Sequence, residues 1–145
     1  MRKWLWSLLA NVRGAVTHPT LVRDAVCDLV VDSLDADSPT PGYLEFRTSG
    51  DVEVATCVLS DPAFDAAGSA GGNSDGVATA DPITDDSSAT GGTIAKAALV
   101  TGGAVDKVLC SVTASTGGGD IEMNSVVISA GQTVSVSSLT YEAMP

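Results

Sequence analysis

The side chains that could do chemistry in this 145-residue chain are one histidine, three cysteines and 18 carboxylates. The histidine is His18, directly before Pro19. A Ser-His-Asp triad needs its histidine beside a nucleophile on an exposed turn, and the sequence has no Gly-x-Ser-x-Gly elbow. We therefore interpret His18 as a solvated capping or interface residue. The chain is predicted to have no catalytic residue and not to be an enzyme.

The three cysteines, Cys27, Cys57 and Cys110, form no Cys-x-x-Cys pair and do not lie near the histidine. Zinc sites draw on such pairs and on several histidines, so no zinc site is expected. The favoured interpretation is three small buried apolar residues in a chain that folds in a reducing cytosol. A bridge between Cys57 and Cys110 stays open, because sequence alone does not give the required geometry.

The carboxylates gather at two places in the sequence, Asp32, Asp35 and Asp37, and Asp81, Asp85 and Asp86. A calcium loop of the EF-hand type needs glycine at its sixth position and glutamate at its twelfth. Counted from Asp35, those positions are Thr40 and Phe46. The acids are therefore predicted to form a solvated surface, and a cation site between loops stays open. We expect no cofactor. Glycoside hydrolysis is not expected either, because few aromatic residues are available to bind a sugar beside two carboxylates.

Charge is distributed unevenly along the chain, which has a net charge of -11. Residues 1–23 carry four basic residues and no acid, whereas the remainder has three basic against 18 acidic residues, a net charge of -15. An acidic body repels the phosphate backbone. Nucleic acid is therefore not an expected partner, except through the basic N-terminal residues. No small-molecule substrate is expected either, because the chain has no catalytic motif.

Residues 1–18 are predicted to form a basic, amphipathic N-terminal arm, because apolar residues recur there at helical spacing. The residues predicted to bind a partner are Trp4, Leu5, Leu8, Leu9 and Val12. A signal peptide is the competing interpretation, but Ser7 and Asn11 interrupt the apolar run and no clear cleavage site follows. The run is also too short to span a bilayer. A membrane-interface anchor is less favoured than a partner contact, because only four basic residues accompany the arm.

Residues 19–145 are predicted to form a single domain, with an amphipathic helix over about 19–34. Its apolar stripe would be buried, and its charged residues, Arg23, Asp24, Asp28 and Asp32, would lie on the other side. From Tyr43 the period changes to two, which predicts strands at 43–47, 52–59, 77–80, 93–100, 104–113, 120–123, 126–128 and 133–141. Eight short strands predict a mainly β fold, an antiparallel β-sandwich or jelly roll over about 43–141.

Three connections have their own predictions. Gly102-Gly103 is expected to turn one hairpin, and Ala130-Gly131-Gln132 to turn another between the last two strands. The segment from Asp61 to Gly76 consists mostly of small residues, which are expected to bury almost nothing and to leave the backbone mobile.

Three segments, in this order, resemble a family of small bacteriophage and prophage proteins. They are residues 55–67 (ATCVLSDPAFDAA), residues 76–85 (GVATADPITD) and residues 118–141 (GGDIEMNSVVISAGQTVSVSSLTY). The resemblance covers most of the chain after about Ala25.

The resemblance implies a virion structural protein, most specifically a capsid decoration or cement protein on the capsid exterior, made in the host bacterial cytoplasm. Its implied partners are the major capsid protein and copies of itself. A tail or neck component and an exported adhesin or binding module are the alternatives. Fold likeness alone does not establish a role, so these are expectations.

Overall fold

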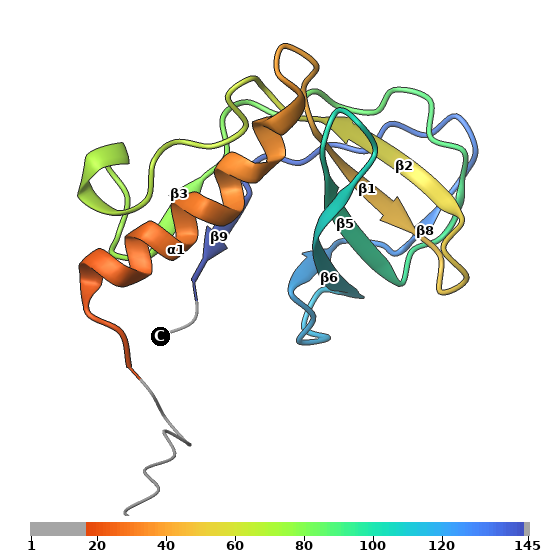
Figure 1. Ribbon diagram of the computed structural model, residues 1–145. Coiled ribbons are helices and arrows are strands. Elements are labelled where there is room, and N and C mark those ends of the chain that lie inside the picture. Colours follow the sequence, from red (N-terminus) through yellow and green to blue (C-terminus); the bar gives the residue numbers. More distant parts are fainter. Residues whose placement is uncertain (1–16, 144–145) are drawn as a thin grey trace, which may run out of the picture.

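The computed structural model describes residues 17–143 (Figure 1). The predicted partner-binding residues Trp4, Leu5, Leu8, Leu9 and Val12 lie outside the described residues. Of the predicted arm, only Thr17 and His18 are described, and neither is helical.

Helix α1 (Thr20–Asp32) begins directly after Pro19 and continues into the 3-10 helix η1 (Ser33–Asp37). The Pro19 carbonyl accepts hydrogen bonds from the backbone N–H groups of Val22 and Arg23, at 2.9 and 3.1 Å. Proline suits this boundary because its φ is compatible with a helix and it has no N–H to leave unpaired. The predicted helix is therefore confirmed, with its last residues in the tighter 3-10 conformation.

The side of α1 that faces the protein is not the side that the apolar stripe predicts. Only Cys27 and Val31 of α1 are buried. Leu21 and Leu29 are 82% and 73% exposed, while Asp24 and Asp28 are only partly exposed. The prediction of a buried leucine and valine stripe with solvated acids is thus wrong.

The main sheet has five strands in the order β2-β1-β5-β6-β7. Their bounds are β1 (Tyr43–Arg47), β2 (Glu53–Val58), β5 (Lys96–Val100), β6 (Asp106–Ala114) and β7 (Ile121–Met123). The sheet curls into a half-barrel (Figure 1). Neighbouring strands are antiparallel except β6 and β7, which are parallel. The mainly β prediction with one α-helix is confirmed, but the sheet is mixed and not wholly antiparallel.

Two short ribbons complete the strand structure. β3 (Val77–Thr79) pairs with β9 (Thr140–Glu142), and β4 (Gly92–Thr93) pairs with β8 (Val127–Ile128), both antiparallel. The β3–β9 ribbon lies beside α1 in Figure 1, and the Cys27 thiol lies 3.6 Å from the Tyr141 carbonyl oxygen. The helix is therefore attached to the ribbon and not to the face of the main sheet.

The core lies on one face of the half-barrel, as the alternation in β1 requires. Leu44 and Phe46 are buried, whereas Tyr43, Glu45 and Arg47, which alternate with them, are half-buried. In the pairing register, Leu44 lies opposite Cys57 and Leu99. These residues belong to one continuous apolar cluster that reaches from α1 to the end of the described chain. Side chains alternate between the faces of a strand, so the opposite face of β1 is left for polar residues.

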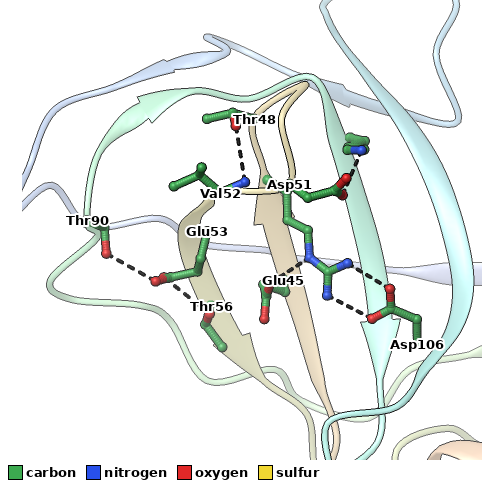
Figure 2. A network of polar contacts seen from close by, with 10 residues as sticks. Glu45, Thr48, Asp51, Val52, Glu53, Thr56, Thr90 and Asp106 are labelled. Carbon is green, nitrogen blue, oxygen red and sulfur yellow. Dashed lines mark hydrogen bonds and ion pairs between the residues drawn. The ribbon is translucent and has the colours of Figure 1, made fainter.

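That opposite face carries a polar network, drawn in Figure 2. The Arg47 guanidinium forms two hydrogen bonds with the Asp106 carboxylate, both of 2.7 Å, across the intervening strand β5. It also contacts Glu45, two residues away on β1. Lys96 of β5 pairs with Asp51 at 2.7 Å. Ionic pairs thus connect β1 to β6, and β5 to the turn between β1 and β2, on the outside of the sheet.

Of the two predicted hairpins, the one at Gly102-Gly103 is confirmed. It joins β5 to β6, with a 3.0 Å hydrogen bond from the Thr101 N–H to the Val105 carbonyl. The one at Ala130-Gly131-Gln132 is wrong. The chain does turn there, but β8 pairs with β4, Val134 forms a bridge with Asp86, and β9 pairs with β3. The Thr133–Tyr141 segment therefore has two separate partners and is a strand only at its end.

The Asp61–Gly76 connection also differs from its prediction. Ala63, Phe64, Ala67 and Gly68 are buried. Gly68 opens the 3-10 helix η2 (Gly68–Gly71) with a φ of +65°, which favours glycine. The expectation that these small residues bury almost nothing is wrong, because the segment packs against α1.

Candidate docking surface

None of the chemically capable side chains is brought into a reactive arrangement within residues 17–143. His18 is exposed at the edge of the described chain. It is not the helix cap, because Pro19 occupies that position and no side-chain hydrogen bond caps α1. No group of three or more histidine, cysteine or carboxylate side chains in this range is placed to hold a metal ion.

All three cysteines are free, with Cys27 and Cys57 buried and Cys110 half-buried. A bridge between Cys57 and Cys110 is ruled out by the topology, because β1 and β5 lie between their strands. Three strand spacings of about 4.8 Å separate them, far more than the ~7 Å that a disulfide tolerates between Cα atoms. Burial raises the pKa of each thiol, which disfavours the nucleophilic thiolate.

The carboxylates have a structural use that the sequence does not reveal. Seven of them accept hydrogen bonds from backbone N–H groups of loops or strands: Asp24, Asp28, Asp35, Asp37, Asp86, Asp120 and Glu122. A buried N–H without a partner is costly, and a charged acceptor gives a strong hydrogen bond. The clustered acids therefore diverge toward separate loops and do not converge on a cation.

The Asp32, Asp35 and Asp37 group shows this divergence clearly. Asp35 accepts from the Ala63 N–H at 3.0 Å, and burial raises its pKa. Asp37 accepts from the Gly103 N–H at 2.8 Å, and hydrogen bonds from the Thr101 side chain and from Gly103 lower its pKa. Asp32 is exposed. One sequence cluster thus supports two different loops.

Two of these acids fix the orientation of α1. The Ala67 N–H donates to Asp28 at 2.7 Å, and the Gly76 N–H donates to Asp24 at 2.5 Å. The buried residues Cys27 and Val31 mark the inward side of α1, so the side opposite them faces outward, with Asp24 and Asp28 at its edge. The apolar residues on it are Leu21, Val22, Ala25, Val26 and Leu29, all exposed. We call this set the α1 apolar face.

The α1 apolar face is the feature that sequence reasoning missed. Periodicity predicts an apolar stripe on this helix and predicts it as the buried side, which is wrong for these five residues. Contiguous exposed apolar residues of this kind mark interaction sites in soluble proteins. The signal in the sequence was the pair Asp24 and Asp28, one helical turn apart, although nothing local says that loop N–H groups lie beside them.

A groove of about 410 Å³ is the second candidate binding surface, after the α1 apolar face. It lies between β7 and the segment 132–139, with Leu44 and Phe46 of β1 among its lining. Within the described residues, no backbone hydrogen bond holds residues 135–138. Glu122 is its one acidic lining residue, so the groove has no pair of carboxylates for acid–base catalysis.

Comparison of the chain with protein-family models, with curated proteins and with solved structures finds no match. None of the helices within residues 17–143 has the length and apolar character of a membrane span.

Proposed function

We propose that this chain is a nonenzymatic bacteriophage virion structural protein, most specifically a capsid decoration or cement protein that binds the major capsid lattice and stabilises the head. The observation that supports a binding role is the α1 apolar face, in which Leu21 is 82% and Leu29 73% exposed. The phage assignment itself rests on the resemblance of residues 55–67, 76–85 and 118–141.

The proposed mechanism is mechanical. Apolar contacts from the arm residues Trp4, Leu5, Leu8, Leu9 and Val12, together with the adjacent α1 apolar face, would bridge neighbouring subunits on the capsid exterior. An interface of about 800 Å² per partner suffices for specific binding, and repetition over the lattice multiplies its effect. A ligand that binds only the assembled shell raises the shell's resistance to disassembly by linkage.

The proposal includes the finer fold prediction, a sandwich or jelly-roll-like body. In support, Ile94, Ile128 and Val134, from outside the five-stranded sheet, belong to the same core cluster as Leu44 and Phe46. Strands and loops therefore cover the core face of the half-barrel. The partners proposed are the major capsid protein and copies of the chain. Nucleic acid, membrane and cofactors are not part of the proposal.

The test compares virions assembled with the natural chain, without it, and with a Leu21→Asp/Leu29→Asp variant. Particles without the chain should assemble but release DNA at a lower temperature than complete particles. The variant should be depleted from purified particles, because charge on the apolar face opposes burial. Leu109→Asp is the control, since Leu109 is 69% exposed on β6, outside α1.

Three outcomes separate the alternatives. Particles that retain DNA equally well without the chain but fail to attach to host cells would replace the cement role with adhesion. Location of the chain at the tail or neck by electron microscopy would replace the head assignment. Processing of the natural N-terminus near Val16, seen by mass spectrometry, would favour the exported module.

A further inference from the structure

The α1 apolar face has the same residue spacing as the arm that precedes it. Leu21, Val22, Ala25, Val26 and Leu29 occupy positions i, i+1, i+4, i+5 and i+8. The arm repeats these intervals with Trp4, Leu5, Leu8, Leu9 and Val12. In helical conformation, both sets form a stripe of the same width and length, about 12 Å along the axis. The two stripes therefore match in size.

Residues 1–16, which lie outside the described residues, join the described chain close enough to the α1 apolar face to reach it. Residues 1–16 lead through Thr17, His18 and Pro19 directly into α1. From Arg13 to Pro19 there are enough residues for the two- to eight-residue connection that joins antiparallel helices. An arm that reverses there would run back along α1, with Val12 near Leu21 and Trp4 near Leu29.

Charge favours the arm over a second copy of α1 as the occupant. Residues 1–16 carry three basic residues, Arg2, Lys3 and Arg13, and no acid, whereas residues 17–145 carry four basic against 18 acidic, a net charge of -14. Packing α1 against its copy would bring two acidic bodies together. Packing the arm on α1 brings opposite charges together.

We propose that residues 1–16 fold back on their own chain and cover the α1 apolar face as an antiparallel helical hairpin. The short tether gives the arm an effective concentration in the millimolar range, which favours its own helix over that of a neighbour. The inference concerns the free chain and does not rest on the virion role. In the virion, docking would exchange this internal contact for one with the shell.

Tryptophan fluorescence tests this proposal directly, because the only two tryptophans, Trp4 and Trp6, lie in the arm. A Trp6→Phe background leaves Trp4 as the single reporter. Its emission should be blue-shifted and protected from acrylamide relative to the urea-unfolded chain. Emission and quenching equal to those of the unfolded chain would overturn the proposal, whatever happens to any variant.

The antiparallel direction predicts an order of effects. Leu29→Asp should shift the Trp4 emission to the red more than Leu21→Asp, because Trp4 lies at the Leu29 end. Leu109→Asp on β6 should leave the emission unchanged. Circular dichroism would check that all three variants keep their folded spectrum, as expected for residues that are 69–82% exposed. Equal effects of Leu21→Asp and Leu29→Asp would overturn the antiparallel hairpin.

Dilution separates the chain's own arm from that of another copy. The blue shift should be independent of protein concentration, and sedimentation should give a monomer. A shift that is lost on dilution together with dissociation of a dimer would overturn the intramolecular arrangement and assign the face to a second copy. These measurements need no virion, so their failure is distinguishable from failure of the proposed function.

Discussion

Arg47 and Asp106 form an ion pair with two parallel hydrogen bonds on the outer face of the sheet. The guanidinium side chain is 14% exposed and the carboxylate 40%, and the pair joins β1 to β6 across β5. The Arg47 hydrogen bonds lower the pKa of Asp106, and those with Asp106 and Glu45 raise the pKa of Arg47. Partial burial and two-point geometry distinguish this pair from ordinary surface pairs, which contribute little.

Replacing Asp106 with Asn should therefore lower the free energy of unfolding at pH 7 by about 0.5–1 kcal/mol, a value limited by the exposure of the carboxylate. Because the folded-state pKa of Asp106 lies below its ordinary value of 3.8, the contribution is fully present above that pH. It is lost as the pH falls through the lowered folded-state pKa. Urea denaturation from pH 7 to 2.5 should show the natural and Asp106→Asn curves converging in acid.

Asp65→Asn is the control for this prediction. Asp65 is exposed and its carboxylate accepts no hydrogen bond within the described residues. Its substitution should leave stability unchanged at both ends of the pH range. If the natural and Asp106→Asn chains still differ equally in free energy of unfolding at pH 2.5, the difference comes from altered packing or hydrogen bonding and not from the charge of Asp106.

The orientation of α1 depends on hydrogen bonds to the Asp61–Gly76 segment as well as on apolar packing. Asp28→Ala removes the acceptor of the Ala67 N–H, and Ala67 is buried. We expect a loss of about 1–3 kcal/mol, the usual penalty for an unsatisfied buried group. Hydrogen exchange should show faster exchange across residues 66–73, including the 3-10 helix η2.

Asp32→Ala is the matched control on the same helix. Asp32 is exposed and its carboxylate accepts no hydrogen bond within residues 17–143, so its loss should not alter exchange in η2. If the Asp28 and Asp32 variants behave alike, the carboxylate–loop contact does not hold the segment.

Elements with local signals were predictable from the sequence. β1 covers the same residues, Tyr43–Arg47, that the alternation predicts, and the Gly102-Gly103 turn joins β5 to β6. Both depend on neighbours close in the sequence. The side of α1 that faces the core was not predictable. It depends on hydrogen bonds to Asp28 and Asp24 from backbone N–H groups 39 and 52 residues further along the chain. An amphipathic helix has two faces, and periodicity does not say which one meets the core.

The prediction of one strand over Thr133–Tyr141 is wrong for a related reason. Its alternation is real, but Val134 forms an isolated bridge with Asp86, whereas Thr140–Glu142 pairs with β3, so its two ends have different partners. A strand pattern specifies which faces are apolar, whereas the partner is chosen by distant parts of the chain. The α1 apolar face is likewise not predictable from the sequence as a docking surface, because only the structure shows which side of the helix is exposed. The partner-binding role of the arm stays a prediction.

At the scale of the whole molecule, the acidic body should oppose its own compaction. Residues 17–145 carry a net charge of -14, from four basic and 18 acidic residues. Raising the ionic strength from 0.01 to 0.15 M shortens the screening length from about 30 to 8 Å. The melting temperature should rise over this range, because weakened repulsion favours the folded state.

Calorimetry in sodium chloride checks this, with an Asp32→Asn/Asp65→Asn variant as the control. The variant removes two charges without breaking a hydrogen bond within the described residues, so it should melt higher at low salt and gain less from added salt. A melting temperature that falls with salt would mean that attractive pairs, such as Arg47 with Asp106, outweigh the repulsion.

The carboxylates that accept loop N–H groups also limit how the surface can change during evolution or redesign. Lysine substitutions at Asp24, Asp28 or Asp35 would neutralise the chain only by releasing the loops that these residues hold. Substitutions that raise the isoelectric point are therefore confined to acids such as Asp32 and Asp65. A variant library selected for folding should keep its acidic character, even in a setting where negative charge has no value of its own.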